Sequence, residues 1–295
     1  MTEVIFRNAR MVLADTVHHG DLVTRDGLIV EISDRRRSGS GIDLEGDWLL
    51  PGLVELHTDH LESHFAPRPG VRWNPLVAVQ AHDAQIAASG ITTVFDALRV
   101  GLDEDDRLTA ADMRLLADAI SDGQRRDRLR ADHLIHLRCE VSAPDMLEGF
   151  AHFQSDPRVR IVSMMDHTPG QRQFATMEAY RTYYQGKTGM SDHEFQAFAG
   201  RRQSEADRWS SQHREVLSEA CRERGIILAS HDDATDAHVA EAARHGVVLA
   251  EFPTTLEAAR AARKAGMKVL MGAPNIVRGG SHSGNVAARD LIDAD

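Results

Sequence analysis

The sequence has 295 residues, of which 42% are apolar and 27% charged, and its formal net charge is −11. The length suits one barrel-sized domain with a small appendage. The acidic balance argues against a nucleic-acid-binding surface, and no apolar run is long enough to span a bilayer. An anionic small molecule stays compatible with this charge, because a metal ion and a few arginines can outweigh it locally. Two cysteines form no disulfide framework and no signal peptide opens the chain, so we expect a cytoplasmic protein.

The first part of the chain, residues 1–50, is expected to be a small β domain. Short apolar runs alternate with turns there, and Asp26-Gly27 favours a hairpin with positive φ. Residues 35–41 have the composition of a polar loop. A domain boundary is therefore expected near residue 50.

From residue 51 to 295 the pattern changes to strand, loop and helix in repetition. The candidate strands are 53–56, 92–95, 134–139, 159–165, 226–229, 247–251 and 268–271. Helical stretches are expected near 76–89, 104–128, 177–185, 192–223, 235–245 and 255–265. This alternation predicts a parallel sheet with crossover helices. We expect an α/β fold, a (β/α)₈ barrel with one strand missing, and the alternative is an open doubly wound sheet.

The segment 171–213 is long for a connection between two strands. It is polar, mixed in charge and helical, and it carries several aromatic residues. It could be a lid or a contact in a homo-oligomer, and a plain packed helical insertion explains the pattern equally well. Histidines in polar stretches, such as His213, are expected to be solvated.

Histidine and carboxylate side chains follow six of the seven candidate strands, and this favours the barrel. They are His57 and Asp59, Glu140, Asp166 and His167, the run His231, Asp232 and Asp233, then Glu251 and, after the last strand, His282. Each of these signals is weak alone, and Asp233 could be only a helix N-cap. Barrel strand ends converge on one axis, however, so these groups would crowd together.

Crowded histidines and carboxylates need a cation between them. The candidate ligands are His57, Asp59, Glu140 and His231, followed by His167 and Glu251. Imidazole with carboxylate suits divalent Zn, Mn or Fe, and Glu140 is best placed to bridge two ions. A two-metal site generates hydroxide at neutral pH. Asp232 and His282 are candidates for proton transfer or for support of the ligands.

Arginines near three of these turns indicate an anionic ligand. Residues 274–285 are expected to form a Gly-rich loop in which backbone N–H groups and an arginine hold phosphate, with Arg278, Gly279, Gly280 and Ser281 as the candidates. Arg172 and Arg68 lie in two further turns. The competing interpretation is that such an arginine pairs with a nearby acid, and we expect this of at least one.

The run Pro51-Gly52-Leu-Val-Glu-Leu-His57-Thr-Asp59, which opens a barrel after a small β domain, resembles the amidohydrolase superfamily. The strings at 165–174, 229–235, 250–255 and 271–285 are more specific. They resemble a branch of diphosphatases that serves phosphonate catabolism through the carbon–phosphorus lyase pathway. The resemblance covers residues 4 to 290.

The resemblance implies a metal-dependent hydrolase that acts on phosphorus-containing anhydrides. It would release pyrophosphate from a ribose 5-triphosphate carrying methylphosphonate and leave the 5-phosphate. The superfamily also supplies a metal-linked Asp from an eighth strand and then returns to complete a composite β-sandwich. This chain ends at Asp295 before such a strand, so the expected barrel is truncated and the usual general base is missing.

Two alternatives stay open on the sequence. One is a hydrolase of the same fold that cleaves the C–N bond of a cyclic amide, which would need the metal ligands and not the arginines. The other is an inactive truncated chain that binds metal, phosphate or a partner subunit.

Overall fold

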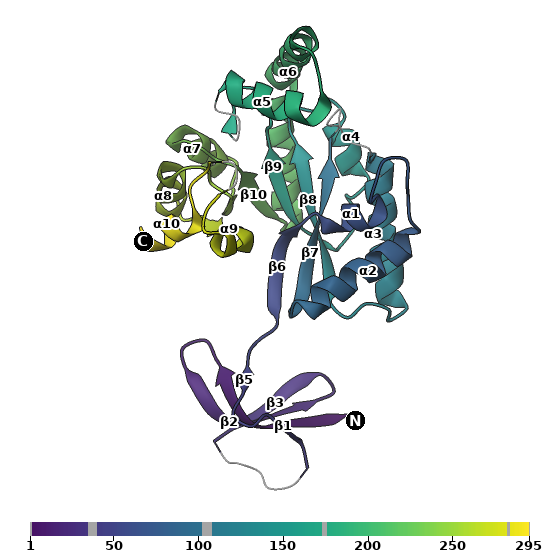
Figure 1. Cartoon of the computed structure of the whole chain (residues 1–295), viewed down its shortest axis with the longest axis vertical. Helices are drawn as coiled ribbons and strands as arrows, with labels where there is room; N and C mark the ends of the chain where they lie inside the picture. Colours follow the sequence, from purple (N-terminus) through teal and green to yellow (C-terminus); the bar gives the residue numbers. More distant parts are fainter. Residues whose placement is uncertain (1, 35–39, 102–107, 173–175, 282–283, 295) are drawn as a thin grey trace. The chain divides into compact units, whose positions relative to one another are not determined.

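The computed structural model describes residues 2–34, 40–101, 108–172, 176–281 and 284–294 (Figure 1). The chain forms two compact units, Met1–Leu53 and Val54–Asp295. Within the described residues, no helix combines the length and the apolar character that a membrane crossing requires.

The smaller unit is a β-sheet with the order β3-β2-β1-β4, in which β5 also pairs with β1. Its strands are β1 (Glu3–Val12), β2 (Val17–Arg25), β3 (Leu28–Ser33), β4 (Ile42–Asp43) and β5 (Trp48–Leu49). Asp26 and Gly27 have φ values of 49° and 83°, which confirms the hairpin turn predicted between β2 and β3. Ala9, Met11 and Leu22 form the buried core of the sheet.

The larger unit is an α/β structure built on a curled seven-stranded parallel sheet. The strands are β6 (Leu53–Thr58), β7 (Ile91–Val100), β8 (Asp132–Glu140), β9 (Val159–Met165), β10 (Ile227–His231), β11 (Leu249–Glu251) and β12 (Lys268–Leu270). Neighbours in the sheet are neighbours along the chain, from β6 to β12. A doubly wound sheet needs a point where the strand order reverses, and the described strands contain none.

The helices of this unit begin and end where local sequence signals place them. They are α1 (His60–Phe65), α2 (Pro75–Ala88), α3 (Ala110–Arg125), α4 (Met146–Ala151), α5 (Met177–Thr188), α6 (Asp192–Arg224), α7 (Asp236–Arg244), α8 (Leu256–Lys264), α9 (Ala273–Arg278) and α10 (Ala288–Asp293). Thr109 and Ser191 each form a capping box, and Gly225 ends α6 in the left-handed region. These contacts satisfy N–H and C=O groups that have no partner within the helix.

Strand β8 shows how the sheet separates its two faces. Ile135, Leu137 and Cys139 belong to the large apolar core that also contains residues of the helices. His136 and Glu140, at the intervening positions, point to the opposite face because side chains alternate along a strand. The inner face at the end of β8 thus receives polar side chains.

The inner face is also where the curled sheet meets itself. Ile161, Ala229 and Leu249 form an apolar cluster there, against which partly buried side chains of β6, β7 and β12 pack, namely Leu56, Phe95 and Leu270. Side chains of β6 and β12, the first and last strands, pack against the same cluster, and this requires strong curvature of the sheet. The functional groups described below therefore converge from strands far apart in the sequence.

Helices α5 and α6 form the long insertion between β9 and β10. Tyr180, Tyr184, Phe195, Phe198 and Ala199 are buried against one another and give the insertion an apolar core of its own. This agrees with the packed helical insertion considered above. The expectation for His213 is wrong: its side chain is buried, and its Nδ1 donates to the Val141 carbonyl at 2.9 Å.

One stretch predicted as a loop is partly helical. Residues 273–278 form α9, where the sequence led us to expect the start of a Gly-rich loop. Pro274 lies in the first turn, where its missing N–H costs nothing, and Gly279 ends the helix with φ of 81°. The Gly and Pro residues that predicted a loop are the boundary signals of a short helix.

Candidate functional site

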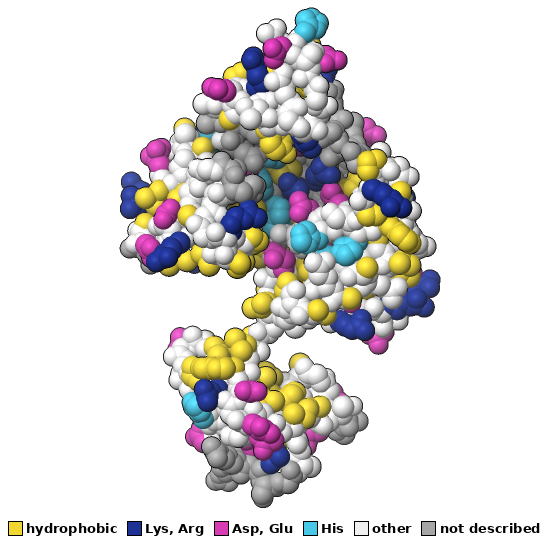
Figure 2. Space-filling view, viewed as in Figure 1, with side chains coloured by type: hydrophobic (Ala, Val, Ile, Leu, Met, Phe, Trp, Pro, Cys, Tyr) yellow, Lys and Arg dark blue, Asp and Glu magenta, His cyan; other side chains and the backbone are white. Residues whose placement is uncertain are grey.

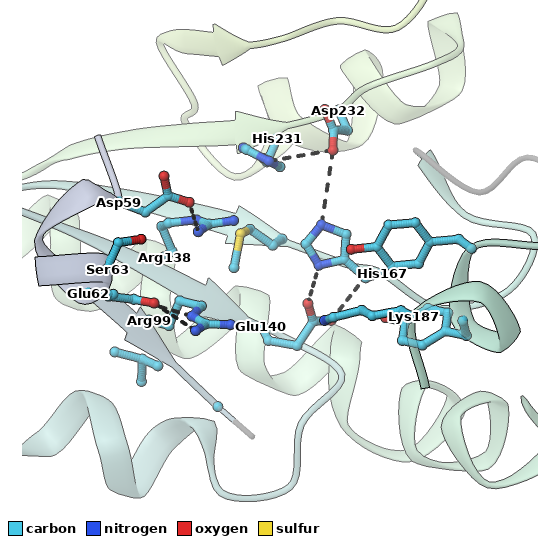
Figure 3. A pocket seen from close by; sticks show the side chains of 15 residues that line it. Asp59, Glu62, Ser63, Arg99, Arg138, Glu140, His167, Lys187, His231 and Asp232 are labelled. Atoms are coloured by element: carbon cyan, nitrogen blue, oxygen red, sulfur yellow. Dashed lines mark hydrogen bonds and ion pairs between the residues drawn. The ribbon is translucent and has the colours of Figure 1, made fainter. Parts of the chain in front are cut away.

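A hollow in the face of the larger unit gathers histidine, acidic and basic side chains (Figure 2). It is a pocket of about 410 Å³ at the ends of the strands. Its charged and histidine lining comprises Asp59, Glu62, Arg99, Arg138, Glu140, His167, Lys187, His231 and Asp232 (Figure 3). The pocket therefore combines candidate metal ligands with cations that can face an anion.

The first group of candidate metal ligands is His57, His136 and Glu251. Glu251 is buried at the end of β11, 3.2 Å from His57 Nδ1 and 3.7 Å from His136 Nε2. Burial opposes the charge of Glu251, but the nearby His136, His231 and His57 outweigh it and hold the pKa of the carboxyl well below its ordinary value. Ser163 Oγ also donates to this carboxylate, at 2.5 Å.

His136 has the protonation state that a metal ligand needs. Its Nδ1 lies 2.8 Å from the Leu56 carbonyl oxygen, which can only accept, so Nδ1 carries the hydrogen. Its Nε2, which contacts Ser163 Oγ and lies near Glu251, then carries the lone pair. Burial lowers the pKa of His136 to about 4, so the ring is neutral at physiological pH.

The second group is His167, His231 and Asp232. Asp232 Oδ2 lies 3.4 Å from His231 Nε2 and 4.0 Å from His167 Nε2. Asp232 has φ of 57°, in the left-handed region that non-glycine residues seldom adopt. Such strained residues cluster at functional sites. Its backbone N–H donates to the Glu251 carbonyl at 2.9 Å, which ties the two strand ends together.

Glu140 orients His167 in this structure. The carboxylate accepts from His167 Nδ1 at 2.7 Å, from the His167 backbone N–H at 3.1 Å and from Ser142 Oγ at 2.6 Å. Burial opposes its charge, and His167 and Arg202 nevertheless lower the pKa of Glu140. Burial opposes the charge of His167 as well, but Glu140 and Asp232 outweigh it and raise the pKa of His167. The His167 Nε2 is left facing the pocket, as in metal sites where a carboxylate holds a ligating histidine.

The predicted ligands are thus placed in different ways. His57 and Glu251 lie in the first group, His167 and His231 in the second, with Asp232 beside them. Glu140 contacts His167. Asp59 lies on the pocket wall, where its carboxylate accepts from Arg138 Nη1 at 3.1 Å.

The arginines chosen from sequence lie elsewhere. Arg172 is buried and ion-paired with Asp233 and Glu241, as expected of at least one of them. Arg68 and Arg278 are exposed, and the described part of the pocket wall includes neither, nor Gly279, Gly280 or Ser281. His282 lies outside the described residues.

Other side chains in the site were missed by sequence reasoning. Arg138 and His136 precede Glu140 by two and four positions, so strand alternation could have placed them on its face. Arg99 was missed because the second strand was predicted to end at residue 95, whereas β7 continues to Val100. Tyr183, Tyr184 and Lys187 come from α5, and their position depends on the packing of the insertion.

A third group, His82, Asp96 and His133, is fully buried between α2 and the outer face of β7 and β8. His82 Nε2 and His133 Nδ1 contact the two oxygens of Asp96 at 2.8 and 2.7 Å. These are hydrogen-bond distances. His133 Nε2 lies 3.4 Å from Asp83 Oδ1, so protonated His133 bridges two buried carboxylates. We interpret this group as a structural hydrogen-bond network.

Comparison with known proteins gives one strong match. The chain is 50% identical over 291 residues to the alpha-D-ribose 1-methylphosphonate 5-triphosphate diphosphatase of Escherichia coli (strain K12), covering 98% of this chain and 76% of that protein. No family model matches.

Solved structures resemble the chain more distantly. N-isopropylammelide isopropylaminohydrolase from Burkholderia multivorans is 16% identical, with a TM-score of 0.46 and coverage of 92% of this chain and 74% of that one. For the L-hydantoinase (dihydropyrimidinase) from Arthrobacter aurescens the identity is 14% and the TM-score 0.45, with coverage of 100% and 66%.

Proposed function

The chain belongs to the family of the alpha-D-ribose 1-methylphosphonate 5-triphosphate diphosphatases, and on that premise we propose that it hydrolyses this ribose triphosphate in phosphonate catabolism. The products are the ribose 5-phosphate, still bearing methylphosphonate, and pyrophosphate. The observation that carries the proposal is one pocket lined both by histidines and carboxylates and by Arg99, Arg138 and Lys187. Hydrolysis of a neutral amide has no use for these three cations.

The donor set supports a metal-dependent reaction. His136 presents a neutral ring whose Nε2 lone pair faces Glu251, and His167 is held by Glu140 with its Nε2 toward the pocket. Imidazole and carboxylate donors of this kind hold Zn, Mn or Fe. His57, His136 and Glu251 would hold one divalent ion, and His167, His231 and Asp232 a second. When bound, such ions lower the pKa of water and neutralise phosphate charge.

The chain's own cations have the task of holding the triphosphate. Arg99 and Arg138 extend from the ends of β7 and β8, and Lys187 reaches the same pocket from α5. Guanidinium groups bind phosphate oxygens bidentately and stabilise negative charge that develops on them. Attack at the phosphorus beside the ribose 5-oxygen then breaks the bond to the next bridging oxygen, and pyrophosphate leaves. Asp232, at the pocket wall, is the candidate acceptor of the proton released by the attacking water.

Further features of the proposal concern the whole protein. The sheet corresponds to seven strands of a (β/α)₈ barrel whose eighth position lies between β12 and β6, because the inner faces of these strands share one apolar cluster. Residues 1–50 form half of a composite β-sandwich. The reaction takes place in the cytoplasm, which agrees with Cys139 and Cys221 both being free thiols.

The test is hydrolysis by the purified chain. The chain is freed of metal, supplied with Mn or Zn and the ribose triphosphate, and assayed for pyrophosphate. We expect release that depends on added metal and stops with chelator. If a folded, metal-loaded sample released no pyrophosphate, the assignment would be wrong.

A further inference from the structure

Two arginines of the pocket wall are held by acids in different ways. Arg99 donates to both oxygens of Glu62, from Nε at 3.3 Å and from Nη2 at 2.7 Å, and Glu62 is only 12% exposed. Arg138 contacts Asp59 through one hydrogen bond of 3.1 Å, and Asp59 is 54% exposed. The Arg138 Nε is buried and has no hydrogen-bond partner among the residues that the structure describes. The Asp59 pair is thus the looser of the two.

Among the described residues, Arg138 is the one side chain that hydrogen-bonds the Asp59 carboxylate. Asp59 occupies the N-cap position of α1, yet within the described part of the chain its side chain makes no capping hydrogen bond. Burial opposes its charge, while Arg138 and His57 outweigh this effect and lower the pKa of the carboxyl. It lines the pocket together with His167, His231 and Asp232. If this carboxylate were released from Arg138, it would remain at the wall of the pocket that holds those groups.

The Asp59 carboxylate can pair with Arg138 or face a metal ion in the pocket, and the charges there oppose both at once. A carboxylate that neutralises Arg138 is less able to serve a metal ion, and a bare guanidinium near the ion repels it. A phosphate oxygen at Arg138 would remove both conflicts, since it replaces the anion that Asp59 supplies. We propose that Arg138 exchanges partners on binding: a substrate phosphate displaces Asp59, whose carboxylate is then free for the metal. This inference rests on the proposed function, and it makes Arg138 the residue that couples phosphate binding to metal binding.

The first test measures pyrophosphate binding by calorimetry in chelator, so that no metal takes part. The proteins are the wild type, Asp59→Asn, Arg138→Met and the double variant, each checked by thermal unfolding. Exchange predicts that Asp59→Asn tightens pyrophosphate binding about fivefold, because breaking a partly exposed ion pair no longer opposes it. The gain should vanish in the Arg138→Met background. Glu62→Gln is the control, because it removes one negative charge from the same pocket. Its effect on pyrophosphate binding should be the same with Arg138 and with Met at position 138.

Other outcomes would overturn the proposal. If Asp59 serves only to orient Arg138, Asp59→Asn weakens pyrophosphate binding. If Asp59 acts only through the overall charge of the pocket, the gain persists when Arg138 is Met. A wild type that binds no pyrophosphate would contradict the proposed function as well, whereas binding with no gain in Asp59→Asn would contradict the exchange alone.

The second test measures Mn²⁺ binding without phosphate. Arg138→Met should tighten Mn²⁺ binding more when Asp59 is present than in the Asp59→Asn background, because only the former releases a carboxylate. Arg99→Met is the matched control, and its effect should be the same in both backgrounds. If Arg138→Met changed Mn²⁺ binding equally in the two backgrounds, the proposal that the released Asp59 carboxylate serves the metal would be refuted.

Discussion

His231 Nδ1 lies 3.4 Å from a carboxylate oxygen of Glu251, and this contact joins the two groups of candidate metal ligands. Glu251 also contacts His57, and His231 also contacts Asp232. The His57 and His231 rings stack with their centroids 5.5 Å apart. Two cation sites that share a boundary of this kind can act on one phosphoryl group from two sides.

Replacement of Glu251 by Gln should remove bound metal. The amide keeps the shape of the side chain but loses the charge that balances a divalent ion among His57, His136 and His231. We expect the metal content per chain to fall by at least one equivalent and pyrophosphate release to fall on the order of a hundredfold or more. Elemental analysis of the purified protein measures the first effect. His193→Gln, at an exposed position of α6, is the control and should change neither quantity.

Arg138→Met and Arg99→Met should each lower kcat/KM for the ribose triphosphate by about a hundredfold, because each removes a cation that faces the phosphates. Steady-state kinetics at saturating metal checks this. Arg278→Met is the informative comparison. The sequence pointed to Arg278 as a phosphate contact, but the structure exposes it at the end of α9, and we expect nearly unchanged kinetics. A large loss of kcat/KM in Arg278→Met, with unchanged kcat/KM in Arg138→Met, would contradict our placement of the substrate.

The buried His133 should make stability depend on pH. Its pKa is raised above 6.5, because Asp96 and Asp83 outweigh the effect of burial. A raised pKa in the folded state contributes stability that is full below pH 6.5 and is lost as the pH rises through the folded-state pKa. Urea unfolding of metal-free protein should therefore show a decline above pH 6.5 that is reduced in His133→Gln. If the free energy of unfolding changed with pH equally in the wild type and in His133→Gln, the proposed stabilisation by protonated His133 would be contradicted.

Asp96 should act at the opposite end of the pH range. Burial opposes its charge, but His133 and His82 lower its pKa below 3.8. Its contribution is therefore present above pH 3.8 and is lost as the pH falls through the lowered value. Acid unfolding of Asp96→Asn should show less dependence on pH in that range than the wild type. An equally steep acid transition in the variant would mean that other carboxylates control it.

Gly101→Ala should disturb both the fold and the site. Gly101 has φ of 99°, and an added Cβ would lie 2.9 Å from Ala143 Cβ and 3.2 Å from Glu140 Cβ. We expect a loss of at least about 1 kcal/mol in the free energy of unfolding, together with weaker metal binding through the displaced Glu140. Gly90→Ala separates the two causes, since Gly90 also has positive φ, but no atom of the described residues lies within 4 Å of an added Cβ. It should cost stability without affecting metal binding.

The sequence predicted the strands of the larger unit well because each is a short apolar run between turn signals. The ranges 159–165 and 268–271 nearly coincide with β9 and β12. The strand ends also pointed to His57, Glu140, His167 and His231. These are local properties, so local sequence sufficed.

The arginines could not be chosen in the same way. Arg172 follows β9, and Arg138 lies near the end of β8, so both arginines are close to a strand end. Arg172 is nevertheless buried against Asp233 and Glu241, which are distant from it in the sequence. Lys187 reaches the pocket only because Tyr180 and Phe198 pack α5 against α6. Strand alternation can place Arg138 on the face of Glu140. Whether an arginine or lysine faces the ligand or pairs with a distant acid depends on tertiary packing, which spacing along the chain does not encode.

In the proposed reaction, this pocket directs water to the phosphorus beside the ribose 5-oxygen. The most direct measurement is phosphorus NMR and mass spectrometry of the products formed in water enriched in a heavy oxygen isotope. We predict metal-dependent formation of pyrophosphate without label and of ribose 5-phosphate carrying one labelled oxygen, with neither product formed by Glu251→Gln. Label in the pyrophosphate, release of single phosphates, or undiminished turnover by Glu251→Gln would contradict the account.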